Sequence, residues 1–163
     1  MCTNPQCSSG ACSRLRWSFD SGELDGIVAL DSSGQPLEVR TFDNSLALAV
    51  DVGQLGAIAG ISFQLPVCNS GKVDIASKSL SFRVYFDGTP ASQAGVYVQV
   101  AVPDPASGGF LDQIGASTGV WTDYSSRLNK SPFSTAATTV TIQAGSLGGA
   151  FSGTIWFDDF RID

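Results

Sequence analysis

The feature that most limits the fold of this chain is an alternation of apolar and polar residues with a period of two. Residues 80–86 read LSFRVYF, so every second residue from Leu80 to Phe86 is apolar. The same alternation recurs in residues 46–52, 96–102 and 139–143. Because side chains two residues apart lie on the same face of a strand, each segment predicts a β-strand with one buried face.

Turn-forming sequences separate these segments. DSSGQP, CNSGK, FDGTP, PDPASGG and GSLGG lie between them, and the chain holds 18 glycines and 7 prolines. Strands at this spacing, with no helical pattern between them, are typical of a sandwich. We therefore predict an all-β fold, a β-sandwich of two antiparallel sheets with about eight to nine strands.

Composition limits the partners. The chain has 163 residues, of which only 15% are charged, and its net charge is −6. An excess of acids disfavours nucleic acid as a partner, and the sequence holds no run of about 18 apolar residues that would cross a membrane. A low-charge β protein of this kind is expected to be secreted or extracellular.

The four cysteines are Cys2, Cys7, Cys12 and Cys68. An even number favours disulfides in an oxidising compartment, and three pairings remain open. Three of the four lie in the N-terminal dozen, so we expect one of them to bond to Cys68. A zinc site is the competing interpretation. Residues 1–13 are interpreted as a Cys- and Ser-rich tail or linker, and 14–163 as the domain.

Signals for catalysis are poor. The chain contains no histidine, which excludes Ser-His-Asp and Cys-His sites, and its only glutamates are Glu23 and Glu38. Paired carboxylates of the glycosidase kind stay formally open, although the aspartates lie mostly in turn-like sequences. We expect a protein that is not an enzyme.

The two ends of the domain resemble one family. Residues 15–27 read LRWSFDSGELDGI and residues 153–163 read GTIWFDDFRID. Both resemble the terminal strands of β-jelly-roll carbohydrate-binding modules, the galactose-binding-like group with families 4, 9 and 22. The resemblance implies a jelly roll over residues 15–163, with the chain ends side by side.

The resemblance also implies a structural calcium ion. Asp20 and Asp158 match the family's acidic ligand positions, and a carbonyl near Asn44 or Ser45 would complete the site. Calcium takes six to eight oxygen ligands, which strand ends from distant parts of a sandwich supply together. The alternative is that these residues only form turns.

A polar and aromatic face is the candidate ligand site. Alternation places Arg83, Tyr85, Tyr97 and Gln99 away from the apolar side of two consecutive strands, and we expect them to share one face. Trp121 and Tyr124 are expected to extend it. Aromatic rings stack on pyranose rings, and Arg and Gln bond hydroxyls. For any single ring, packing against the core is the alternative role.

These observations predict a non-catalytic carbohydrate-binding module. We expect it to bind a polysaccharide or oligosaccharide, and to be a monomer attached to a larger polysaccharide-degrading enzyme that it targets to its substrate. The alternative is a structural or adhesive cell-surface sandwich that binds a protein. A small jelly-roll polysaccharide lyase is a third alternative.

Overall fold

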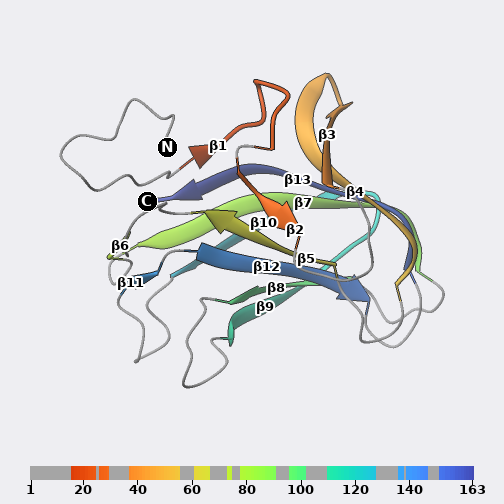
Figure 1. Ribbon diagram of the computed structural model, residues 1–163. Coiled ribbons are helices and arrows are strands. Elements are labelled where there is room, and N and C mark those ends of the chain that lie inside the picture. Colours follow the sequence, from red (N-terminus) through yellow and green to blue (C-terminus); the bar gives the residue numbers. More distant parts are fainter. Residues whose placement is uncertain are drawn as a thin grey trace.

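The alternating segments form the strands of two antiparallel sheets, which a computed structural model stacks face to face (Figure 1). The structure describes residues 16–24, 26–29, 37–55, 61–66, 73–74, 78–90, 96–101, 110–127, 136–137, 139–146 and 151–163. No helix occurs among these residues, and hence none that is long and apolar enough to cross a membrane.

The first sheet has the strand order β10-β7-β13-β4-β3, with β1 paired to β13. Its strands are β1 (Arg16–Trp17), β3 (Leu37–Phe42), β4 (Ser45–Leu55), β7 (Ser79–Pro90), β10 (Trp121–Arg127) and β13 (Phe151–Ile162). The second sheet has the order β2-β5-β12-β8-β9. Its strands are β2 (Val28–Ala29), β5 (Ile61–Pro66), β8 (Val96–Ala101), β9 (Phe110–Ala116) and β12 (Thr139–Ser146).

The predicted sandwich of two antiparallel sheets is confirmed. Two of its strands, β1 and β2, have only two residues, and the nine others in the described part have six or more. A separate pair, β6 (Val73–Asp74) with β11 (Ala136–Ala137), lies outside both sheets. The longer strands therefore agree with the eight or nine that turn spacing indicates.

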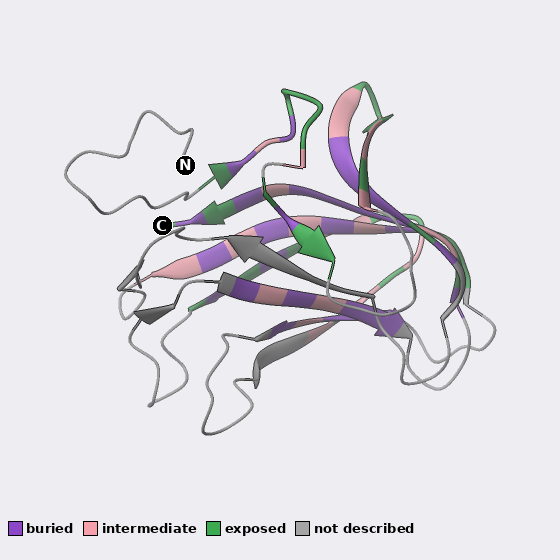
Figure 2. Ribbon diagram, viewed as in Figure 1, coloured by how far each residue is buried: buried purple, intermediate pink, exposed green. Residues whose placement is uncertain are grey.

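The core lies between the sheets, and burial alternates along the strands as the sequence predicts (Figure 2). On β7 the even-numbered residues from Leu80 to Phe86 are buried, while Arg83 and Tyr85 are only half-buried. An aromatic group anchors this core. Phe82 contacts the ring of Phe160 at 5.0 Å between centroids. Each such ring buries a large apolar area, the main source of stability in a sandwich.

The two ends of the described domain lie side by side. Arg16 pairs with Arg161 and Trp17 with Phe160, in antiparallel register. Trp17 is fully buried, so this short strand carries a large apolar side chain into the core. The expected adjacency of the chain ends is thus confirmed.

A bulge near the end of β13 changes which residues face inward. The register shifts between Asp158 and Arg161, and Asp159 has a φ of 54°. Before the bulge the odd-numbered Phe157 is buried, and after it the even-numbered Phe160 is buried. An extra residue on one strand reverses the alternation beyond it, so the bulge turns both phenylalanines inward.

The four cysteines and residues 1–13 lie outside the described residues. The disulfides, the competing zinc site and the extent of the tail therefore stay predictions.

Candidate functional site

The four residues expected on one face lie on two different faces. Arg83 and Tyr85 are on β7, which pairs with β10 and β13 in the first sheet, whereas Tyr97 and Gln99 are on β8, which pairs with β9 and β12 in the second. All four alternate with buried residues, so each points out of the sandwich. The prediction of a single shared face is wrong, because consecutive strands in the sequence belong to opposite sheets.

Four rings gather on the outer face of the first sheet, the face turned away from the second sheet. This outer aromatic cluster comprises Phe42, Tyr85, Trp121 and Trp156. Strand register builds it, because Tyr85 lies opposite Trp121 on β10 and opposite Trp156 on β13. Phe42 comes from the end of β3 and stacks on Trp156 with 4.6 Å between ring centroids.

Small residues make room for the rings. Ala49 lies opposite Trp156 on β4, and both Ala47 and Ala49 are buried beneath the cluster. Trp156 is itself only 8% exposed, while Phe42, Tyr85 and Trp121 are half-buried. The cluster therefore has a packed base and three rings that keep part of their surface in solvent.

Arg83 lies over one of these rings and is held by two carboxylates. Its guanidinium carbon lies 4.5 Å from the centroid of Trp121. Nη2 donates to Asp158 Oδ2 at 2.6 Å, and Nε lies 3.4 Å from Asp159 Oδ2. The hydrogen bond to Asp158 is the main cause that raises the pKa of Arg83, with burial opposing it. The guanidinium is thus fixed in orientation as well as in charge.

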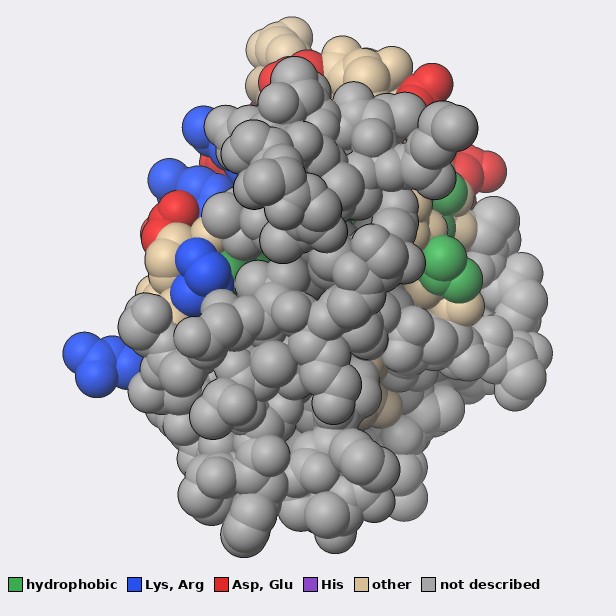
Figure 3. All heavy atoms as spheres, turned by 60° about the vertical axis from the view of Figure 1, so that its left-hand side comes forward, with side chains coloured by type: hydrophobic (Ala, Val, Ile, Leu, Met, Phe, Trp, Pro, Cys, Tyr) green, Lys and Arg blue, Asp and Glu red, His purple; other side chains and the backbone are tan. Residues whose placement is uncertain are grey.

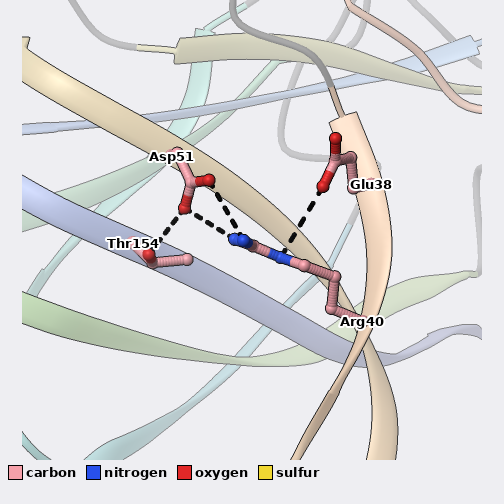
Figure 4. Close-up of polar contacts among 4 residues, drawn as sticks. All are labelled: Glu38, Arg40, Asp51 and Thr154. Carbon is pink, nitrogen blue, oxygen red and sulfur yellow. Dashed lines mark hydrogen bonds and ion pairs between the residues drawn. The ribbon is translucent and has the colours of Figure 1, made fainter.

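Arg40 is held in the same way at the other end of the cluster (Figure 4). It donates to both oxygens of Asp51, at 3.0 and 2.6 Å, and its guanidinium carbon lies 5.1 Å from the Trp156 ring. Thr154 Oγ1 donates to Asp51 Oδ1 at 2.7 Å. The bond from Arg40, followed by that from Thr154, holds the pKa of Asp51 below its ordinary value.

Tyr124 does not extend this face. It is 2% exposed and stacks on Phe82 in the core, with ring centroids 4.7 Å apart. Trp121 and Tyr124 are three residues apart on one strand, and an odd separation places two side chains on opposite faces. The expectation for Trp121 as part of the face agrees with its position, and that for Tyr124 is wrong.

The outer face of the second sheet is more polar. Gln99 lies opposite Gln143 on β12, and Tyr97 lies opposite Gly145. Tyr97 is only 7% exposed, and a Cβ added at Gly145 would lie 2.8 Å from the tyrosine Oη. The ring therefore lies against the backbone of the neighbouring strand. This arrangement packs Tyr97 closely and offers little of its face to a ligand.

The expected calcium ligands are placed as follows. Asp20 is exposed in the turn after β1, Asn44 is exposed in the turn between β3 and β4, and Ser45 is half-buried at the start of β4. Asp158 is 3% exposed, and its other oxygen, Oδ1, accepts the backbone N–H of Asp159 at 2.8 Å. Among the described residues, no group of three or more His, Cys, Asp or Glu is placed to hold a metal.

Asp158 does not fit a calcium ion in this arrangement. Both of its oxygens have hydrogen-bond donors, and the nearest cation is the Arg83 guanidinium, whose positive charge opposes a second cation. A calcium site without Asp158 stays a prediction, and its remaining candidate ligands are Asp20, Asn44 and Ser45.

Sequence reasoning missed Phe42 and Arg40. Both lie in the segment LEVRTF on the same side as Glu38, since all three have even numbers on β3. An aromatic residue among charged ones on a strand's outer side was the available signal. Trp156 is different, because the alternation with Ile155 and Phe157 predicts its outward position.

The fold resembles those of solved carbohydrate-binding modules. A CBM28 module described as specific for non-crystalline cellulose matches with a TM-score of 0.65 at 14% identity, covering 90% of this chain and 92% of that one. A CBM27 module of Caldicellulosiruptor saccharolyticus in complex with mannohexaose gives 0.63 at 15% identity, covering 94% and 97%.

An adhesin domain has the same fold. The K1 cleaved adhesin domain of Lys-gingipain from Porphyromonas gingivalis gives a TM-score of 0.56 at 15% identity, covering 91% of this chain and 96% of that one. Neither a protein-family model nor a curated protein sequence matches the chain. At these identities the likeness establishes the fold, a β-sandwich jelly roll of the kind found in carbohydrate-binding modules, as the terminal motifs predict.

Proposed function

We propose that this protein is a non-catalytic carbohydrate-binding module that holds a glycan chain on its outer aromatic cluster. The observation that carries the proposal is three half-buried rings, Phe42, Tyr85 and Trp121, flanked by two arginines that carboxylates hold in place. Partly exposed rings stack on pyranose faces, and fixed guanidinium groups donate hydrogen bonds to hydroxyls. The two similar modules, one described as specific for non-crystalline cellulose and one in complex with mannohexaose, are consistent with this proposal.

The angles between the rings favour a single glycan chain over a crystalline surface. Tyr85 and Trp121 are inclined by 59°, Phe42 and Tyr85 by 55°, and Phe42 and Trp121 by 69°. A flat crystal face requires rings that share one plane, whereas inclined rings suit a chain whose successive sugars turn. We therefore expect soluble polysaccharides and amorphous regions as ligands.

The biological role follows from the ligand. We infer a secreted module that keeps an attached polysaccharide-degrading enzyme close to its substrate, which raises the local concentration of cleavable chain. Adhesion to a protein partner is the second candidate, because the Lys-gingipain adhesin domain has the same fold.

Affinity electrophoresis in gels that contain soluble polysaccharides tests the proposal, with a pull-down on crystalline cellulose beside it. We expect retardation by at least one soluble glycan and little binding to the crystalline one. Trp121→Ala should weaken binding about tenfold, since the lost ring contact is worth about 1–1.5 kcal/mol. Folding of the variant is checked by circular dichroism.

Tyr97→Ala is the matched control, because it removes a ring from the outer face of the other sheet. Loss of binding in this variant with full binding in Trp121→Ala would move the site to the second sheet. A wild-type protein that no glycan retards, and that captures a purified cell-surface protein instead, would favour the adhesive function.

A further inference from the structure

A second group of charged residues lies on the outer face of the first sheet, where β1 pairs with β13. Arg16 and Arg161 lie directly opposite each other on β1 and β13, and both are exposed. Opposed residues of an antiparallel pair have Cβ atoms about 5 Å apart, so two like charges there repel each other. The two arginines face each other although acidic residues outnumber basic residues in the chain by 15 to 9.

A third arginine lies on the same face. Arg161 is opposite Ser81 on β7, and Ser81 is opposite Ser125 on β10, two residues before Arg127. Arg127 is exposed and points outward, as Ser125 does. From strand spacing it lies about 10 Å across the sheet from Arg161 and about 7 Å along it. Ser81 and Ser125, which lie between the two arginines, have small side chains that project little from the sheet.

These three arginines lack the carboxylates that the other two on this face have. Arg40 is paired with Asp51 and Arg83 with Asp158, whereas no ion pair of the described residues involves Arg16, Arg127 or Arg161. Two acids lie two residues from Arg161 in the sequence: Asp159 is paired with Arg83, and Asp163 is exposed, with its backbone bonded to that of Ser79. We call Arg16, Arg127 and Arg161 the arginine end.

The segment before Arg16 adds no acid. The residues before Arg16 include no Asp or Glu and one more arginine, Arg14. In Figure 3, which turns the side of the chain ends forward, Lys and Arg side chains gather along the left-hand edge, with a few acids among them. Three exposed arginines without an ion pair among the described residues outnumber Asp163, the unpaired acid two residues from Arg161, and so form a local site for anions, because guanidinium groups donate paired hydrogen bonds to carboxylates and sulfates.

We propose that the arginine end binds the carboxylate or sulfate groups of an acidic polysaccharide whose chain continues onto the outer aromatic cluster. This inference rests on the proposed function, and it names the charge class of the ligand. Tyr85, in the cluster, is four positions along β7 from Ser81, at the arginine end. That separation is roughly 13 Å along an extended strand, a distance that a short run of sugars covers. The rings hold the sugar faces, and the arginines hold the acidic groups.

Affinity electrophoresis with a polyuronate, a sulfated galactan and an uncharged xyloglucan, at low and high ionic strength, tests this. Arg16→Gln/Arg161→Gln removes both charges, and Arg16→Lys/Arg161→Lys is the matched control that keeps them. Mobility is compared with gels without polysaccharide, which corrects for the altered charge. We expect the wild type to bind one acidic glycan more tightly than xyloglucan, and salt to weaken that binding.

The Arg16→Gln/Arg161→Gln variant should lose on the order of tenfold in affinity for the acidic glycan and keep its affinity for xyloglucan. The Arg16→Lys/Arg161→Lys variant should keep its affinity for both glycans. The polyuronate and the galactan distinguish carboxylate from sulfate as the bound group. If the Arg16→Gln/Arg161→Gln variant binds the acidic glycan as tightly as the wild type does, the inference is overturned. Wild-type binding to xyloglucan alone would overturn it too and leave the proposed function standing, whereas binding to no glycan would overturn both.

Discussion

Arg83 and Asp158 lie opposite each other on β7 and β13 and form an ion pair 2.6 Å long, although 75 residues separate them in the sequence. The Asp158 side chain is 5% exposed and that of Arg83 is 33% exposed. The pair therefore has one buried carboxylate and one cation that still reaches solvent. It connects the centre of the first sheet to the ring of Trp121.

Asp158→Ala should lower the free energy of unfolding by about 2–3 kcal/mol. Removing one partner of a fully buried pair costs about 3–5 kcal/mol, and the loss is smaller here because Arg83 is partly solvated. Chemical denaturation measures it. The loss should be equal in calcium and in chelator, because the bond to Arg83, and not a metal, explains it. Asp123→Ala, at an exposed acid opposite Arg83, is the control and should change little. A loss confined to calcium-containing buffer would restore Asp158 as a calcium ligand.

Phe82→Ala should destabilise the protein by about 3–5 kcal/mol, because Phe82 is buried between Tyr124 and Phe160 and truncation leaves a cavity. Tyr85→Ala, on the outer side of the same strand, should cost much less and act on glycan binding. Thermal unfolding compares the two variants, at about 2–4 °C of melting temperature per kcal/mol for a chain of this size. A larger drop for Tyr85→Ala would contradict the assigned faces of β7.

The pair between Arg40 and Asp51 should contribute stability that depends on pH. Because the pKa of Asp51 is lower in the folded protein, its contribution is complete above the unfolded pKa of about 3.9 and is lost as pH falls through the folded pKa. Both side chains are exposed, so the contribution is about 0.2–1 kcal/mol. Unfolding of wild type and Asp51→Asn is compared from neutral pH to about pH 2. The difference should shrink below about pH 4, and a difference that grows there would contradict the assignment.

Gly145→Ala should displace Tyr97. The new Cβ would lie 2.8 Å from the tyrosine Oη and 2.9 Å from Cζ, so the ring must move off the backbone at a cost of about 1–2 kcal/mol. Gly115→Ala is the matched control, because Gly115 faces Tyr97 from the other side and a Cβ there meets no atom within 4 Å. Tyrosine fluorescence and chemical denaturation report both. Equal stability of the two variants would show that the ring does not lie against Gly145.

The sequence predicted the parts of the fold that depend on neighbouring residues. The alternation in β7 identified Phe82 as buried and Arg83 and Tyr85 as outward, and the motifs at the two chain ends predicted their pairing. The outward position of Trp156 was predictable in the same way. What alternation alone did not predict was the bulge at Asp159, which reverses the faces of the last residues of β13.

The candidate site was predicted only in part, because it joins residues from strands that are distant in the sequence. Within one strand, the sequence by itself determined which side chains share a face, since a two-residue repeat follows from local backbone geometry. Only the tertiary structure decided which strands are neighbours. It placed β7 and β8 in opposite sheets, brought Phe42 onto Trp156, and set Arg83 beside Asp158. Strand order depends on the whole chain, because every strand must bury its apolar side against the other sheet at the same time. The sequence of a single segment does not contain that condition.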